Sequence, residues 1–201
     1  MTYEGWRMTY TVKEIFYSIQ GEGYNTGKPA HFIRFSGCNL DCAFCDTDFD
    51  GVSETGGKFV TAQDLVDEVS SRYNRMCKLV VLTGGEPGLQ VDAKLIKEFK
   101  RQGYKLAIET NGTVELPRGI DWITLSPKAG CEIVERDVNE IKIVYPPQNG
   151  IKPENFSRGY TNYFVQPLDN EPKHIEDCCQ FCIDNPRWRV SLQTHKIMGV
   201  P

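Results

Sequence analysis

The 201-residue sequence lacks the features that mark membrane, repetitive and exported proteins. No stretch approaches the roughly 18 to 20 consecutive apolar residues that a membrane helix needs. There is no low-complexity segment and no repeat at the period of a solenoid. The first residues, Met1 to Arg7, include no apolar signal segment, so we expect a cytoplasmic protein that makes no membrane contact.

An excess of basic charge is also absent. The 23 lysines and arginines are outnumbered by 27 aspartates and glutamates, which gives a formal net charge of −4. Nucleic-acid-binding proteins usually carry a basic excess or stripe, so we expect no nucleic acid among the partners. The hydrophobic content of 40% suffices for one buried core, and we expect one domain over residues 1–201.

Apolar periodicity predicts alternating strands and helices. The expected strands are Thr11–Ser18, His31–Phe35, Lys78–Leu82, Lys105–Ile108, Trp122–Leu125, Ile141–Tyr145, Tyr163–Val165 and Trp188–Leu192. The expected helices are Thr61–Met76, Asp92–Gln102 and Pro172–Asp184. In the first helix Thr61 can act as the N-cap, and the expected buried face consists of Leu65, Val66, Val69, Tyr73 and Met76.

Most of these strands are followed by a short cluster of polar residues. In barrel-like α/β folds, the C-terminal ends of the strands form the rim of the active site. Because only three helices accompany the strands, the usual eight-fold barrel cannot be complete. The pattern therefore predicts an α/β fold with a partial, open TIM-like barrel and few helices.

Three of the eight cysteines form a compact motif. Cys38, Cys42 and Cys45 have C-x3-C-x2-C spacing directly after the apolar run His31–Phe35. Three thiolates from one short loop can hold three irons of a 4Fe-4S cluster and leave the fourth iron open to a ligand. The alternative is a zinc site, in which the pair Cys42 and Cys45 would be completed by Cys178, Cys179, Cys182 or a histidine. Zinc would leave Cys38 without a role, so the cluster is the favoured interpretation.

A glycine-rich turn, Thr83-Gly84-Gly85-Glu86-Pro87, follows the strand expected at Lys78–Leu82. Adjacent glycines allow backbone groups to approach a ligand without a Cβ in the way. Exposed carbonyls there can accept hydrogen bonds from an ammonium group, and Glu86 adds negative charge. Alone, the segment could be an ordinary tight turn. Together with the three-cysteine loop, it predicts a binding site.

These two motifs, in this order, make the chain resemble the radical S-adenosylmethionine superfamily. The resemblance implies a partial barrel of the radical SAM type and a 4Fe-4S cluster on Cys38, Cys42 and Cys45. The open iron of that cluster would chelate the amino and carboxylate groups of S-adenosylmethionine.

Further segments resemble one branch of that superfamily, the 7-carboxy-7-deazaguanine synthase family, over nearly the whole chain. The segments are Ile19–Gly23, Phe32–Leu40, Cys45–Phe49, Leu82–Pro87, Glu109–Gly112, Ser126–Lys128, Gln166–Asp169 and Ser191–Lys196. The resemblance implies a radical ring contraction of 6-carboxy-5,6,7,8-tetrahydropterin to 7-carboxy-7-deazaguanine with loss of ammonia, in queuosine and 7-deazapurine biosynthesis. It also implies Mg²⁺, a homodimer, and an electron donor of the flavodoxin or ferredoxin type.

The resemblance also implies roles for individual residues. Positions that match S-adenosylmethionine contacts are Phe44, Cys45, Asp46, Gly85, Ser126, Pro127, Lys128, Gln166, Pro167, Leu168 and Asp169. Positions that match pterin contacts are Ile19, Gln20, Gly21, Arg34, Thr83 and Pro201. Thr47 matches a magnesium ligand, and the further catalytic candidates are Glu22, Lys58 and Glu109. An arginine suits the pterin carboxylate, because its guanidinium binds carboxylates through two parallel hydrogen bonds.

Two interpretations other than this enzyme stay open at this point. A glycyl-radical activase has the same cysteine spacing, but its substrate is a partner protein and it gives no reason for the Ile19–Gly23 segment. A non-catalytic zinc module is the other. The cysteines Cys178, Cys179 and Cys182 suggest a second metal site, but Ile175, Cys179, Cys182 and Ile183 share a helical face, which favours core packing.

Overall fold

Nine strands form one sheet in the computed structural model, which describes residues 9–72, 74–135, 137–147, 150–156 and 159–201. The strands are β1 (Tyr10–Ile19), β2 (Pro29–Phe35), β3 (Gly57–Phe59), β4 (Leu79–Gly84), β5 (Lys105–Thr110), β6 (Trp122–Leu125), β7 (Glu140–Tyr145), β8 (Asn162–Pro167) and β9 (Trp188–Val190). Their order in the sheet is β3-β1-β2-β4-β5-β6-β7-β8-β9.

The sheet is mostly parallel and does not close. From β2 to β9, each strand runs parallel to its neighbour, whereas β1 pairs antiparallel with both β2 and β3. β3 and β9 are the two edges, and within the described part of the chain no strand pairing joins them. The predicted partial, open barrel of an α/β fold is confirmed.

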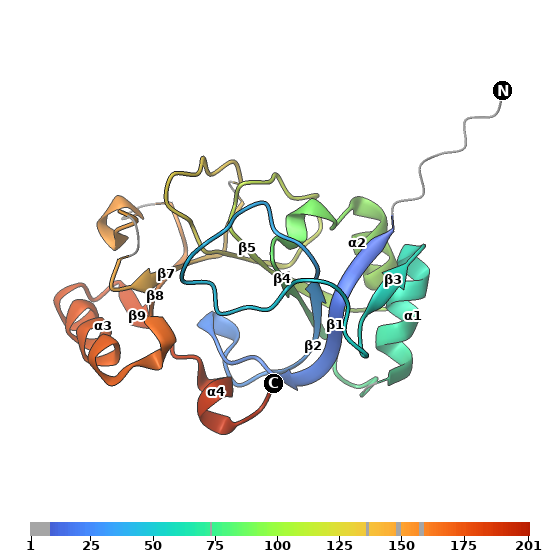
Figure 1. Ribbon diagram of the computed structural model, residues 1–201, viewed down its shortest axis with the longest axis horizontal. Coiled ribbons are helices and arrows are strands. Elements are labelled where there is room, and N and C mark those ends of the chain that lie inside the picture. The colour runs from blue at the N-terminus through green and yellow to red at the C-terminus, as the bar shows by residue number, and fades with distance from the viewer. Residues whose placement is uncertain (1–8, 73, 136, 148–149, 157–158) are drawn as a thin grey trace.

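Helices cover the outer face of the sheet in two groups, as Figure 1 shows. Helices α1 (Ala62–Arg72) and α2 (Ala93–Arg101) share a core with β1, β2, β4 and β5, and α3 (Pro172–Asp184) packs on β7, β8 and β9. Asp92 caps α2 by accepting a hydrogen bond from the Leu95 N–H at 2.8 Å. Leu95, Ile96 and Phe99 are the buried face, as predicted, and each contributes roughly 1.5–3 kcal/mol by burial. Among the described helices, none has both the length and the apolar character that crossing a bilayer would require.

The inner face of the sheet is more polar than the outer face. The two faces can differ because successive side chains of a strand point to opposite sides. Leu82 of β4 and Ile108 of β5 lie in the outer core, whereas the next residues, Thr83 and Glu109, line a cavity on the inner face. The register places Arg34 of β2 beside Thr83. The ends of neighbouring strands therefore bring polar side chains together on one side of the sheet.

Several expectations about element boundaries and faces are wrong. The first helix ends at Arg72, and Met76 is 87% exposed because the Asn74 side chain accepts the Met76 N–H in a local turn that competes with the helix. Tyr73 lies outside the described residues. The last strand ends at Val190 rather than Leu192. Strand β3 and the short helix α4 (Thr194–Met198) were not expected.

The buried face of α3 is also different from the predicted one. Cys179 and Ile183 are exposed, whereas Cys178 and Phe181 are buried and Cys182 packs beside them. Phe181 sets this rotation, because its ring contacts Tyr145 and Trp188. The α3 cysteines are on the outer face of the sheet, away from the cavity, so they do not complete a zinc site with Cys42 and Cys45.

Two glycines allow the loop after β4 to pack on the start of the cysteine loop. A Cβ on Gly84 would lie 2.2 Å from the Phe35 carbonyl oxygen, and a Cβ on Gly85 would lie 2.1 Å from that of Gly37. The Glu86 N–H donates to the Gly37 carbonyl oxygen at 3.0 Å. The glycine pair is therefore required for contact with the chain's own backbone, in addition to any contact with a ligand.

Glu86 is fully buried, and its carboxylate joins the segment after β4 to the end of β5. Contrary to the expectation, it does not line the cavity. The carboxylate accepts hydrogen bonds from the Gly88 N–H at 2.8 Å, the Thr110 hydroxyl at 2.8 Å and the Asn111 N–H at 2.7 Å. Burial raises the pKa of Glu86, and these donors oppose that rise. The carboxylate thereby fixes the loop after β4 against the loop after β5.

We predict that Glu86→Gln lowers the free energy of unfolding by roughly 1–3 kcal/mol, because the amide NH₂ would face a backbone N–H that needs an acceptor. Denaturant unfolding of the metal-free protein, followed by tryptophan fluorescence, measures the change. Glu176→Gln is the matched control, since the Glu176 side chain is 76% exposed. Equal unfolding midpoints for Glu86→Gln and the wild type would show that the loops do not depend on this carboxylate.

Candidate active site

One cavity of about 760 Å³ lies on the inner face of the sheet, at the C-terminal ends of the parallel strands. Its walls come from β1, β2, β4, β5 and β7, from the cysteine loop after β2, and from the segment that carries α4. In Figure 1 the cysteine loop crosses in front of the strand ends, and α4 lies beside the start of β2. The cavity is therefore built from segments at both ends of the chain.

Cys38, Cys42 and Cys45 all line this cavity, and each is a free thiol. Cys42 and Cys45 are held close in space by a turn, in which the Cys45 N–H donates to the Cys42 carbonyl oxygen at 2.9 Å. Burial raises the pKa values of Cys38 and Cys42, so a metal that binds there must displace their protons. In the described residues, no three Cys, His, Asp or Glu side chains are already arranged around a single ion. The donor set itself, three thiols on one wall of a large cavity, fits a cluster with three cysteine ligands.

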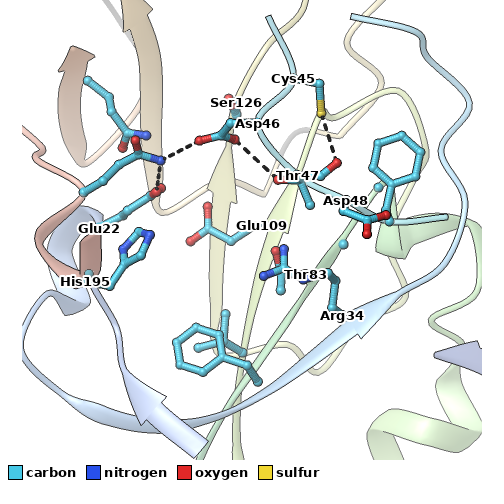
Figure 2. A pocket seen from close by; sticks show the side chains of 18 of the residues that line it. Glu22, Arg34, Cys45, Asp46, Thr47, Asp48, Thr83, Glu109, Ser126 and His195 are labelled. Atoms are coloured by element: carbon cyan, nitrogen blue, oxygen red, sulfur yellow. Dashed lines mark hydrogen bonds between the residues drawn. The ribbon is translucent and has the colours of Figure 1, made fainter. Parts of the chain in front are cut away.

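The residues after Cys45 connect the cysteine loop to the segment near α4. Asp46 accepts hydrogen bonds from Gln193 Nε2 at 3.0 Å and from Lys196 Nζ at 2.7 Å. Burial would raise the pKa of Asp46, but these two donors lower it below its usual range, so the carboxylate stays ionised. Thr47 lies next to it, and its hydroxyl is 3.5 Å from Asp46 Oδ1. Figure 2 marks this contact with a dashed line.

Arg34 and the end of β1 form another wall. The Arg34 Nε donates to Glu14 Oε1 at 2.7 Å, and the guanidinium lies over the Phe16 ring at 5.7 Å from its centroid. Among the described residues, no oxygen binds the two terminal nitrogens of Arg34, which face the cavity side of β2. These contacts fix the direction of the guanidinium while leaving its outer edge for an anionic ligand.

The segment near α4 is attached to the turn after β1. The Gly21 carbonyl accepts from both the N–H and the hydroxyl of Thr194 at 3.0 Å, and the Ser18 hydroxyl donates to the Pro201 carbonyl at 2.7 Å. A Cβ at Gly21 would lie 2.1 Å from His195 Nδ1, so glycine is required for this packing. The contacts explain why two segments far apart in the sequence line the same cavity.

A buried ion-pair network forms the floor of the cavity. Lys142 of β7 pairs with Glu22 and, at 3.0 Å, with Glu109, and its side chain is 8% exposed. Burial lowers the pKa of Lys142, but the carboxylates of Glu109 and Glu22 more than offset this and raise it. Burial raises the pKa of Glu109 to about 7, whereas Lys142 and Gln193 hold the pKa of Glu22 below its usual range despite burial. The floor thus contains one firmly charged ammonium group and a carboxylate that titrates near neutrality.

Figure 2 places Glu109 near the middle of the cavity, with Glu22 and His195 on one side and Arg34 and Thr83 on the other. Burial lowers the pKa of His195, so its ring is mainly neutral at pH 7. The sequence did not point to Lys142 or Gln193 as site residues. A lysine within the apolar strand Ile141–Tyr145 was the available signal for Lys142, because charged residues are rarely buried without a partner.

Most residues predicted from the sequence line the cavity. They are Ile19, Gln20, Gly21, Glu22, Arg34, Cys38, Cys42, Phe44, Cys45, Asp46, Thr47, Thr83, Gly85, Glu109, Ser126, Lys128, Gln166, Pro167, Leu168, Asp169 and Pro201. Pro127 is buried and instead lines a small apolar space with Phe44 and Val144. Lys58 does not reach the cavity, because it is exposed on the edge strand β3 opposite Thr11. Lysine is common on such edges, where its charge discourages pairing with another chain.

Comparisons with known proteins agree with this geometry. The family model of the Radical SAM superfamily matches residues 32–145. A 7-carboxy-7-deazaguanine synthase from Caulobacter vibrioides is 43% identical over 211 residues, which covers 96% of this chain and 100% of the relative. A protein of the same name from Bordetella pertussis is also 43% identical, with the same coverage. The crystal structure of QueE from Escherichia coli is similar with a TM-score of 0.76 and 28% identity, and the match covers 92% of this chain and 94% of that one. The chain therefore belongs to the radical SAM superfamily and, within it, to the 7-carboxy-7-deazaguanine synthase family.

Proposed function

We propose that this chain catalyses the reaction for which its relatives are named, the formation of 7-carboxy-7-deazaguanine. The substrate would be 6-carboxy-5,6,7,8-tetrahydropterin, and ammonia would be released. The observation that carries the proposal is one cavity with three thiols on one wall and a guanidinium and two carboxylates on the others. Such a cavity can hold a cluster-bound cofactor and a small, polar, anionic substrate side by side.

Membership in the radical SAM superfamily implies a 4Fe-4S cluster and S-adenosylmethionine. Cys38, Cys42 and Cys45 would hold the cluster. When bound, the two cofactors supply an adenosyl radical that removes a hydrogen atom from the substrate, as expected where cofactors carry the difficult chemistry. The protein's contribution is to orient both reactants and to exclude water. The residues that would hold S-adenosylmethionine are Phe44, Asp46, Gly85, Ser126, Lys128 and Gln166–Asp169.

Arg34 would bind the carboxylate of the pterin, because its outer nitrogens face the cavity and its direction is fixed by Glu14 and Phe16. Ile19, Gln20, Gly21, Thr83 and Pro201 would enclose the rest of the pterin. Thr47 would supply one ligand to Mg²⁺, which keeps several of its waters and needs few protein ligands. Asp46, ionised beside it, favours a cation there.

The reaction also needs a source of electrons, and the protein that carries it out has an assembly state and a location in the cell. We propose a low-potential donor of the flavodoxin or ferredoxin type, a homodimeric assembly and a cytoplasmic location. A chemical reductant replaces the protein donor in the assays below, so their outcome does not depend on which donor is used.

The direct test is an anaerobic assay of the reconstituted protein with the pterin, S-adenosylmethionine and dithionite. We expect 7-carboxy-7-deazaguanine, identified by mass, and ammonia in equal amounts. A protein that cleaves S-adenosylmethionine but leaves the pterin unchanged would contradict the proposed function. A glycyl radical formed on an added partner enzyme under the same conditions would favour the activase instead.

Replacing Cys38, Cys42 or Cys45 singly by alanine should abolish both the iron-sulfur absorbance and product formation, because each thiol is one of only three proposed ligands. Iron and sulfide analysis of the reconstituted variants measures the loss. Cys179→Ala is the matched control, since this cysteine is exposed on α3 and should leave both properties unchanged. Full product formation by any one of the three cavity variants would refute the cluster assignment.

Arg34→Ala should raise the KM for the pterin by about tenfold or more, because a hydrogen-bonded contact to a charged group contributes about 1.5–3 kcal/mol. Arg34→Lys should also raise it, since an ammonium group cannot form two parallel bonds to a carboxylate. Iron content and the affinity for S-adenosylmethionine should not change. Arg101→Ala, on the exposed side of α2, is the control, and an unchanged KM in Arg34→Ala would remove Arg34 from the substrate site.

A further inference from the structure

Lys142 is a buried cation that the proposed chemistry does not yet use. It projects from the inner face of β7, where the neighbouring residues Ile141 and Ile143 face the outer core. Its ammonium group contacts Glu22, from the turn after β1, and Glu109, from the end of β5. The Lys142 side chain is 8% exposed, and its two carboxylate partners come from separate segments. Lys142 therefore links these two segments through ion pairs.

The carboxylates around Lys142 are unequally satisfied. Glu140 accepts hydrogen bonds from the Tyr24 N–H at 2.9 Å and from the Thr124 hydroxyl at 3.0 Å. Glu22 accepts hydrogen bonds from Lys142 Nζ and, at 2.9 Å, from Gln193 Nε2. Besides Lys142, Glu109 has only a long contact of 3.5 Å from Gln20 Nε2 among the described residues.

Glu109 is therefore the carboxylate with spare acceptor capacity, and it points into the open cavity between Glu22 and Arg34 (Figure 2). The pterin that we propose as substrate carries a carboxylate at one end and several N–H groups at the other. Arg34 suits the first end, and ionised carboxylates accept hydrogen bonds from the second.

We propose that Lys142 is a positioning residue for substrate binding, which holds the Glu109 carboxylate beside Glu22 so that both carboxylates can accept hydrogen bonds from N–H groups of the pterin. The inference rests on the proposed function. Lys142 lines the cavity, but its ammonium group is already paired with Glu22 and Glu109, so in this proposal it acts through those two carboxylates.

This role has a pH dependence whose direction follows from the surroundings of Glu109. Burial raises the pKa of Glu109 to about 7, the Lys142 charge lowers it, and the Glu140 and Glu22 charges raise it. Other charged or titratable groups around this floor are Lys128, after β6, which is near Lys142, and His195, which is near Glu22, Lys142 and Asp46. Arg34 lies on the opposite side of Glu109 (Figure 2). As the pH falls through 7, Glu109 becomes protonated and loses acceptor capacity, so substrate affinity should fall. Without Lys142, that loss should begin at a higher pH.

The experiment measures the Kd of 6-carboxy-5,6,7,8-tetrahydropterin for the reconstituted holoenzyme with S-adenosylmethionine, anaerobically and without reductant, from pH 6 to 9. Lys142→Met should move the midpoint of the pH dependence upward by about one unit or more, because an adjacent opposite charge lowers a carboxyl pKa by about that amount. The Kd at pH 7 should then rise about fivefold or more. Lys142→Arg should keep the wild-type midpoint. Lys94→Met, on the exposed face of α2, is the matched control and should behave as the wild type.

Glu109→Gln tests the same inference without removing the buried cation. If Lys142→Met does not fold, this variant shows whether ionisation of Glu109 controls the affinity for the pterin. We expect its Kd to lose the dependence on pH near 7. A wild-type midpoint in either Lys142→Met or Glu109→Gln would overturn the inference. Product formation by the wild type, measured on the same preparations, separates this result from a failure of the proposed function.

Discussion

The buried carboxylate of Glu86 is the contact on which the geometry of the cavity depends. It accepts hydrogen bonds from two backbone N–H groups and one hydroxyl, and these donors belong to the loops after β4 and β5. The preceding residues, Gly84 and Gly85, meet the backbone at the end of β2 and at the start of the cysteine loop at distances that leave no room for a Cβ. Three loops from three neighbouring strands are thus fixed at one end of the sheet, and the cysteine thiols are fixed with them. A buried carboxylate without these donors would cost several times the stability that each hydrogen bond adds, so the arrangement is specific as well as stable.

The cavity has its composition because the parallel strands alternate their side chains. The outer side chains are apolar and are covered by α1, α2 and α3, whereas the inner side chains near the strand ends are charged or polar. An eight-fold barrel would fill this interior with side chains from every strand. The open sheet leaves a space of about 760 Å³, and loops and the α4 segment close over it instead of further strands. The proposed cofactor and a small substrate can then share one cavity, which a filled barrel interior does not allow.

The parts that were predicted correctly are those that depend on local sequence. Eight of the nine strands, the cap and buried face of α2, and the spacing of Cys38, Cys42 and Cys45 involve residues that are close in the chain. The errors concern features that depend on distant partners. Rotation of α3 is set by Phe181 against Trp188 and Tyr145. Met76 is a different case, because the turn at Asn74 that competes with the helix is local and was overlooked. Lys142 was missed because its partners lie 33 and 120 residues away in the sequence. Lys58 was assigned to the site because no sequence pattern distinguishes an edge-strand lysine from a pocket lysine.

Side-chain contacts also explain why motifs spread over the chain form one site. Gln193 Nε2 donates both to Asp46, in the cysteine loop, and to Glu22, after β1. Glu22 pairs with Lys142, and Lys142 pairs with Glu109 at the end of β5. The wall that carries the three thiols is therefore connected to the ion-pair network on the floor of the cavity through charged or charge-assisted contacts. Such contacts are stronger than neutral ones where water is largely excluded. Each buried charge in this network depends on its partners, because a buried charge that loses its partner strongly destabilises the folded protein. The cysteine loop, the turn after β1, the end of β5 and the α4 segment are consequently constrained together, and the unit that carries the proposed function is this network rather than any one motif.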